Sequence, residues 1–280
     1  ASIGMAFTRR DRALTSIAKL RATALKLYES HAKWNFGFDS GDNAGDDTKR
    51  TKSSINWLDH SDRLLGVLLQ LFRHLTRYLT LPTSSRARHR VTGQKEAREL
   101  GTVSDALGEN MVEQIGQLSD FCEIMKREGL PPQEAIRIRQ WERFLLTELE
   151  TLRMIKQYRT PQGLRSFGRL FSVFLPPFYA PVYVQTARDL NSLGVGIAFA
   201  CLTSVALTTL FETVFQMEDP FVIPSGLDGI RVDAELLSNF KPRALRCRKE
   251  YFPQAPPFEQ DVDTKPTSPS TGGQVLGLRV

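Results

Sequence analysis

Apolar side chains recur every three or four residues along four long, otherwise polar stretches of the chain, which is the period of an amphipathic helix. The spacing predicts helices at Phe7–Trp34, between Ser61 as an N-cap and a stop at Pro82, at Val103–Arg127 and at Gln133–Tyr158. Each helix has an apolar stripe that needs a partner. We therefore expect an all-α fold in which these helices form a polar bundle.

The helix after Ser61 is apolar on more than one face, yet it carries Arg63, Arg73 and Arg77. Each of these charges would cost about 2.5–3.5 kcal/mol at the centre of a bilayer. We therefore place this helix inside the bundle rather than in a membrane.

Two uncharged runs follow the polar stretches, at Leu170–Thr186 and Asn191–Phe211, and a short polar turn with Arg188 and Asp189 separates them. About 20 apolar residues in a helix cross the hydrocarbon core of a bilayer. The runs predict an integral membrane protein, held by a transmembrane hairpin of two helices near Phe171–Thr186 and Leu193–Phe215.

Prolines interrupt the first run. Pro176, Pro177 and Pro181 each lack a backbone donor, so we expect the first arm to be broken or kinked and to face protein or water at the break. The alternative interpretation of both runs is a hairpin buried in the core of a soluble helical protein.

The average composition conceals this segregation, since the mean hydropathy is −0.26 and 41% of residues are hydrophobic. The formal net charge of +6 is compatible with several partners, but its distribution is informative. Basic residues are dense in Arg137–Arg169 and Lys241–Lys249, on both flanks of the hairpin. The positive-inside rule then predicts a multi-pass protein whose large polar domain lies on the cytosolic side.

No pattern of catalytic residues is visible. The four histidines are scattered, and Cys122, Cys201 and Cys247 are too far apart to suggest a disulfide framework or a zinc site. An acidic stretch from Asp39 superficially resembles a calcium loop, but Ala44 and Arg50 occupy the positions where such a loop needs Gly and Glu. We expect no enzyme activity, no cofactor and no bound metal.

The stretch Thr83–Arg98 is basic but has no interleaved aromatic residues, so it offers no platform for stacking nucleobases. We expect a basic loop there, with anionic lipid or a protein partner as the alternative role, and no nucleic acid partner.

Short motifs on both sides of the hairpin resemble the bestrophin family. Ahead of the first run, Thr151–Pro177 resembles the family's entry into its later membrane helices, with Arg159, Thr160, Pro161, Pro176 and Pro177 as the membrane-entry motif. After the second run, Met217–Phe221 is similar to the family's acidic-Pro-Phe motif, whose residues here are Glu218, Asp219, Pro220 and Phe221.

Further stretches extend the resemblance and also show departures from it. Leu227–Leu236 is similar to the helix start that follows the acidic motif, and Ala6–Arg12 corresponds to the cytosolic end of a preceding membrane helix. Val222 stands where the family commonly has Gly, and only two acidic residues remain of a longer calcium-binding cluster in animal members. The earlier membrane helices would lie upstream of Ala1.

The resemblance implies a subunit of an anion channel, assembled as a ring of identical copies with a basic helical vestibule. Its partners would be small anions such as chloride and the membrane lipid, and transport would be passive. The alternative is a non-conducting, membrane-anchored scaffold that binds a partner or anionic lipid through Arg86–Arg98 or Lys241–Lys249. A soluble helical binding protein is the third hypothesis.

The sequence thus divides into four parts: a polar-side helical bundle at 1–168, the hairpin at 169–216, the acidic motif with a basic helical segment at 217–250, and a tail at 251–280. The tail is rich in Pro, Ser, Thr and Gly, so we expect it to be disordered.

Overall fold

A computed structural model of the chain describes residues 2–34, 55–82, 94–158, 162–216, 219–221 and 229–258. Within these ranges every regular element is a helix, which confirms the all-α prediction. The elements are α1 (Ser2–Trp34), α3 (Trp57–Thr80), α4 (Gln94–Arg127), α5 (Pro132–Gln157), α6 (Gln162–Phe178), α7 (Ala180–Asp189), α8 (Leu193–Gln216), the π-helix η2 (Ala234–Ser238) and α9 (Asn239–Tyr251).

Two predicted helix starts were wrong. The N-cap of α3 is Asn56, whose side-chain oxygen accepts hydrogen bonds from the backbone N–H groups of Leu58 and Asp59. Ser61 is instead buried inside the helix. Helix α4 begins at Gln94, so Lys95 and Arg98 lie on a helix and not in the predicted loop.

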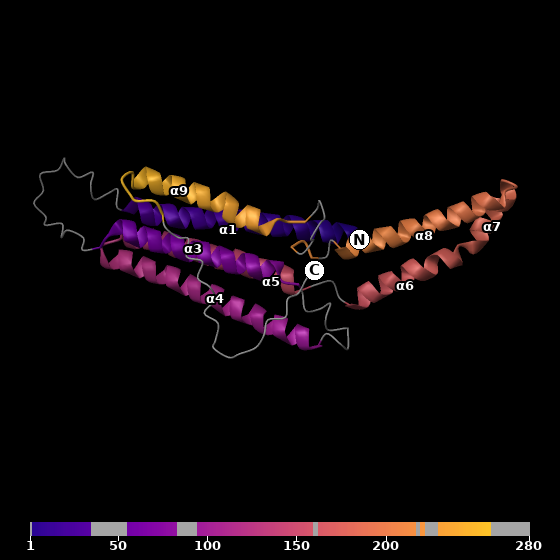
Figure 1. Ribbon diagram of the computed structural model, residues 1–280, viewed down its shortest axis with the longest axis horizontal. Coiled ribbons are helices and arrows are strands. Elements are labelled where there is room, and N and C mark those ends of the chain that lie inside the picture. Colours follow the sequence, from indigo (N-terminus) through magenta and orange to yellow (C-terminus); the bar gives the residue numbers. More distant parts are fainter. Residues whose placement is uncertain are drawn as a thin grey trace, which may run out of the picture.

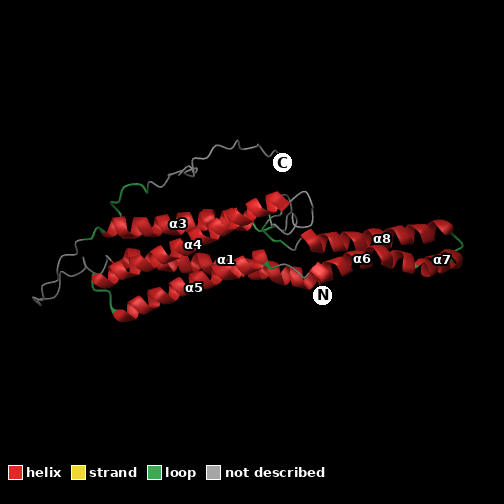
Figure 2. Ribbon diagram, turned by 90° about the horizontal axis from the view of Figure 1, so that it is seen from below, coloured by secondary structure: helices red, strands yellow, loops and turns green. Residues whose placement is uncertain are grey.

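Helices α1, α3, α4 and α5 form a bundle with the cross-section of a square. The most extensive contacts join α1 to α5 and α3 to α4, and smaller contacts join α4 to α5 and α1 to α3. Figures 1 and 2 together place α1 and α4 at diagonally opposite corners. Both α1 and α4 run antiparallel to α5. On α1, Arg9 lies beside Ile155 and Lys19 contacts Glu148. On α4, Gly108 lies beside Arg153 and Ser119 donates a hydrogen bond to Glu142.

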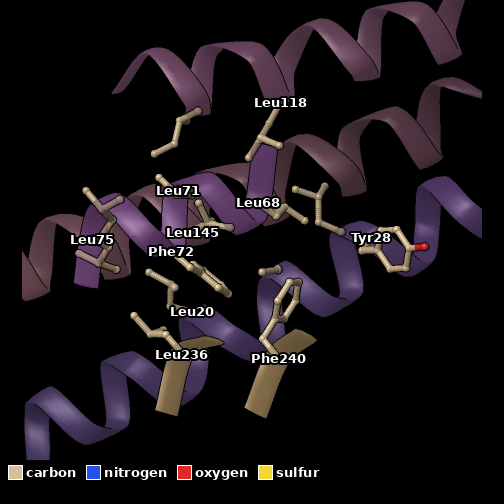
Figure 3. Packing of buried hydrophobic residues seen from close by; sticks show 14 of the residues in the cluster. Leu20, Tyr28, Leu68, Leu71, Phe72, Leu75, Leu118, Leu145, Leu236 and Phe240 are labelled. Atoms are coloured by element: carbon tan, nitrogen blue, oxygen red, sulfur yellow. The ribbon is translucent and has the colours of Figure 1, made fainter. Parts of the chain in front are cut away.

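The core of the bundle consists of the apolar stripes that the sequence predicted. Leu20 of α1, Leu118 of α4 and Leu145 of α5 surround Leu68 and Phe72 of α3, all of them fully buried (Figure 3). Burying one such side chain contributes about 1.5–3 kcal/mol. The bundle therefore has a hydrophobic core of its own.

The C-terminal helix α9 closes one side of this core. Phe240 packs edge-on against Phe72, with ring centroids 4.9 Å apart, and Leu236 of η2 is buried beside it (Figure 3). Pro242 has no backbone N–H with which to donate a helical hydrogen bond, and the π-helix η2 precedes it.

The arginine at position 248 ties the end of α9 to the start of α3. Its Nε and Nη2 each donate to a carboxylate oxygen of Asp62 at 2.7 Å, and its Nη1 donates to the carbonyl of Pro256 at 2.7 Å. Phe258 lies against the same guanidinium. The first residues of the predicted tail thus pack on the bundle, and residues 259–280 lie outside the described residues.

Candidate functional site: the hairpin and its junction with the bundle

Helices α6, α7 and α8 form a hairpin that extends from one end of the bundle (Figures 1 and 2). The first arm is broken at Tyr179, immediately after Pro176 and Pro177, so it consists of α6 and α7 instead of one span. This confirms the predicted break. The turn at the far end uses Asn191 in a left-handed conformation, with φ of 48°, which Asn tolerates better than most residues.

The two arms touch closely at glycines. A Cβ atom added to Gly196 of α8 would lie 2.8 Å from the Cβ of Ala187 and 2.9 Å from the carbonyl oxygen of Tyr183 on α7. A Cβ added to Gly168 of α6 would meet the ring of Phe211 on α8 at 2.8 Å. Small residues are what allow membrane helices to approach one another in this way.

The outer surface of the hairpin is apolar and exposed. Leu193–Thr213 on α8 has a mean hydropathy of 2.0, and only 6% of it is buried. Among the described residues it is the one helix that is long and apolar enough to cross a membrane. Exposed large apolar side chains occur on all three helices, including Phe171, Phe174, Phe178, Val182, Leu202 and Val205.

The contrast with α3 shows that this exposure is not a property of apolar helices in general. Leu68, Leu71, Phe72 and Leu75 of α3 are fully buried by their neighbours. An apolar patch as long as α8 exceeds what soluble monomers expose, and such patches mark a protein or membrane contact.

At the base of the hairpin, Lys156 joins three elements. Its Nζ donates to the carbonyl oxygen of Leu79 in the last turn of α3 at 2.6 Å, and it lies 3.1 Å from a carboxylate oxygen of Asp219 after α8. Only 5% of the Lys156 side chain and 13% of the Asp219 side chain are exposed. The chain that leaves the hairpin is therefore fixed to the end of the bundle by a largely buried ion pair.

A second cation fixes the entry to the hairpin. The guanidinium of Arg9 on α1 donates hydrogen bonds to the carbonyl oxygens of Ile155 and Tyr158, at the end of α5. Both carbonyls lie at the C-terminal end of α5. The last carbonyl groups of a helix carry partial negative charge and accept no hydrogen bond from within the helix. Arg9 thus holds the entry of the hairpin to the bundle, and Lys156 holds its exit.

The acidic motif folds back onto the bundle. Asp219 also accepts a hydrogen bond from the N–H of Phe221 at 3.2 Å, and Pro220 accepts one from the N–H of Ile230 at 2.9 Å. Phe221 and Pro220 are buried, so the described residues of the motif anchor the chain to the bundle. Glu218 lies outside the described residues.

The membrane-entry motif is only partly visible. Arg159, Thr160 and Pro161 lie outside the described residues. Pro176 is buried and Pro177 is exposed, both in the last turn of α6. The structure thus places these two prolines on the hairpin, while Asp219 lies with Lys156 at the junction.

Sequence analysis missed Lys156 and Arg9. The signal for Lys156 was present, because it continues the buried stripe of Leu145, Leu149 and Leu152 on α5, where a charged residue needs a buried partner. No comparable signal marks Arg9, which donates to backbone carbonyls.

A buried histidine pair lies elsewhere, in the bundle. Nδ1 of His31 on α1 lies 3.1 Å from Nε2 of His60 on α3, and the rings of Trp57 and Phe121 pack edge-on against His60. Burial lowers the pKa of His31 to about 3 and that of His60 to about 4. Asp59 raises and Arg63 lowers the pKa of His60 more weakly. Both rings are therefore neutral at pH 7.

The described residues contain no group of three or more His, Cys, Asp or Glu side chains able to hold a metal ion. Their polar contacts at the junction are ion pairs and helix-end hydrogen bonds. The arrangement can position the hairpin against the bundle.

Comparison with solved structures shows that this architecture is shared with another protein. A proline-to-alanine variant of a membrane protein superimposes with a TM-score of 0.54 over 89% of this chain and 84% of its own, at 13% sequence identity. The chain has the fold of a membrane protein. No protein-family model and no curated protein matches the sequence.

Proposed function

We propose that the protein is a subunit of a bestrophin-like anion channel, inserted in the membrane through its hairpin. The observation that carries the proposal is the exposure of α8. This apolar helix is long enough to span a membrane, and no other described part of the chain covers it. The shared fold with a membrane protein supports membrane insertion. The motifs on both sides of the hairpin support the family.

In this proposal the bundle stands on the cytosolic side and concentrates anions, as the excess of basic residues favours. No covalent chemistry is involved, since a pore needs only a path of suitable width and charge. Identical subunits would surround that path. The anchored entry and exit keep each hairpin at a fixed position relative to its bundle.

Reconstitution of the full chain into liposomes tests the proposal. Chloride-loaded liposomes that contain the protein should release chloride faster than protein-free liposomes when an outward gradient is imposed. A chloride electrode measures the release. A matched control carries Val205→Arg on α8, which should prevent insertion and abolish the release. Release no faster than from protein-free liposomes, with insertion verified by flotation, would contradict the channel proposal.

A membrane-anchored scaffold is the second candidate. It is favoured by α9, where Arg243, Arg246 and Lys249 are exposed and have no ion pair among the described residues. Insertion without chloride release, together with retention of a cytosolic partner that the variant R243E/R246E loses, would support the scaffold instead.

A further inference from the structure

Helices α1 and α4 present oppositely charged surfaces on opposite corners of the bundle. The two helices lie at diagonally opposite corners, so their outer faces lie on different sides of the bundle (Figures 1 and 2). Charges on the two faces are consequently unable to meet within one chain.

The acidic face lies on α4 and consists of Asp105, Glu109, Glu113 and Asp120, all exposed. No Lys, Arg or His occurs from Glu99 to Met125. In the described part of the chain none of these four carboxylates forms an ion pair, and Glu113 only accepts a hydrogen bond from Gln117 at 3.5 Å.

A shallow groove of about 700 Å³ runs along this face. Asp105, Glu109, Glu113 and the exposed Val112 line it, with Arg153 of α5 at one side. Arg153 is already paired with Glu150 at 2.6 Å. The groove is therefore mainly acidic, with the exposed Val112 as its large apolar residue, and suits a basic side chain that has a long aliphatic stem.

The basic face lies on α1 and consists of Arg12, Lys19 and Lys26, also exposed. These cations recur every seven residues, which is close to two helical turns, so they share one stripe of the helix. The small exposed residues Thr15, Ala18 and Ala22 lie between them and allow another helix to approach.

Among the described residues, the cations of the basic face have only weak partners. Lys19 lies 3.5 Å from Glu148, and Lys26 lies 2.7 Å from Glu29. Such surface pairs are weak and leave most of the charge available. Asp11 is exposed next to Arg12, and the cations still outnumber the carboxylates of α1 on this face. The residues that α1 contributes to the face therefore carry a net positive charge, while Glu148 of α5 lies at its edge.

The two faces match in length and in height. Asp105 to Asp120 spans about 22 Å and Arg12 to Lys26 about 21 Å, at 1.5 Å per residue. Contacts to α5 show how α4 and α1 are aligned along the bundle. On α4, Gly108 lies beside Arg153 and Ser119 beside Glu142. On α1, Lys19 contacts Glu148, which lies between those two residues of α5. Both faces thus occupy the same level of the bundle and run in the same direction.

We propose that the acidic face on α4 of one copy docks against the basic face on α1 of the next copy. A rotation about an axis parallel to the bundle brings the two faces together without changing their height. Because the faces differ, the contact is heterologous, and repeating it generates a ring when the successive rotations complete a full turn. This inference rests on the proposed ring of identical subunits and names the surfaces that form it.

A second copy explains both faces, whereas a lipid surface explains neither. The faces extend along the bundle away from the hairpin, and electrostatic attraction falls off within about 8 Å at physiological salt. Anionic lipid would also repel the acidic face. Opposed charges in the contact orient the copies and disfavour pairing of like faces.

Crosslinking tests the contact directly. In a Cys201→Ser/Cys247→Ser background, which leaves only the buried Cys122, the full chain carrying both K26C and D120C is inserted into liposomes and treated with a short bis-maleimide. We expect a ladder of covalent multimers that ends at one maximum size. Each single variant should stay at the size of the untreated chain. Dimers from the D120C variant alone, or no ladder from the double variant, would overturn the proposal.

Charge reversal with rescue gives a second, independent test. The variants R12E/K26E and D105R/D120R should each reduce the multimer to smaller species in detergent, measured by light scattering, and the combined variant should restore it. Arg143→Glu, an exposed charge on α5, is the matched control and should leave the size unchanged. Failure of the combined variant to assemble, although it unfolds at the wild-type temperature, would overturn the proposal.

The outcomes separate this inference from the channel proposal. Multimers without the predicted crosslinks, together with chloride release, overturn the inference and leave the channel standing. The predicted crosslinks without chloride release support the contact and contradict the channel. A monomer without chloride release contradicts both.

Discussion

The ammonium group of Lys156 lies 3.1 Å from a carboxylate oxygen of Asp219 and 2.6 Å from the carbonyl oxygen of Leu79, in an environment that excludes most of the solvent. One side chain therefore connects the end of α3, the end of α5 and the exit from α8. Because its stem continues the apolar stripe of α5, the lysine is part of the core as well as of the ion pair.

Removing one partner of this pair should be costly. Lys156→Met keeps the stem but leaves the Asp219 carboxylate buried without its cation, so we expect a loss of about 3–5 kcal/mol in the free energy of unfolding. Asp219→Asn should also destabilise the protein. Denaturant titration in detergent, followed by circular dichroism, measures both.

The double variant K156M/D219N provides the control. Because it removes both charges, it should lose less than the sum of the two single losses. Strictly additive losses would show that the pair does not act as a unit.

The packing of α7 on α8 depends on Gly196. Gly196→Ala places a methyl group 2.8 Å from the Cβ of Ala187 and 2.9 Å from a backbone oxygen, so the helices must separate. We expect a loss of about 1–3 kcal/mol, the usual range for overpacking. Thermal unfolding in detergent measures it.

Gly194 is the matched control for that substitution. It lies two residues earlier on the same helix, and an added Cβ there would meet nothing closer than the Ser192 hydroxyl at 3.8 Å. Gly194→Ala should therefore leave the melting temperature unchanged or raise it slightly. Equal effects of the two alanines would contradict the close packing.

The exposed face of α8 should determine membrane partitioning. Val205→Arg puts a charge near the middle of the span, at a cost of about 2.5–3.5 kcal/mol for insertion. We expect the variant to shift from the membrane pellet to the soluble or aggregated fraction after cell lysis. Gln140→Arg, exposed on α5, should remain in the pellet.

The histidine pair should make the bundle sensitive to acid. Burial lowers the pKa of His31 to about 3 and of His60 to about 4, against about 6.5 in the unfolded chain. Above pH 6.5 the rings are neutral in both the folded and the unfolded chain, so their protonation does not change the free energy of unfolding. Below pH 6.5 the unfolded chain binds protons that the folded chain does not, so stability should fall progressively down to about pH 3, where the folded chain can also protonate His31.

Unfolding midpoints measured between pH 7.5 and 4.5 would show this effect. The variant H31L/H60L removes the two rings from the titration, and its midpoint should fall less over the same interval. A wild-type midpoint that falls no more steeply than that of the variant would contradict the assignment.

Much of the architecture followed from periodicity, because helices and their buried faces depend on local spacing. The apolar stripe around Leu68 and Phe72 and the proline break before Tyr179 could both be predicted in this way. The absence of charge predicted a long apolar helix near Leu193–Phe215, and the structure has an apolar helix of spanning length at Leu193–Thr213.

Tertiary relationships could not be predicted from the same patterns. Ser61 and Asn56 are both good N-cap residues, and only the packing of Trp57 into the core decides between them. The partners of Lys156 are 77 and 63 residues away in the sequence, and Arg9 donates to backbone carbonyls. Likewise, nothing local indicates that α1 and α4 occupy opposite corners.

The contacts of Arg248 have a consequence for how the bundle opens. A single guanidinium holds the first turns of α3, the end of α9 and the segment up to Phe258, so none of these can detach while the others remain in place. They should behave as one cooperative unit, with backbone amides that exchange their hydrogens at similar rates. Arg248→Leu would uncouple them, and the amides of α9 would then exchange well before those of α3.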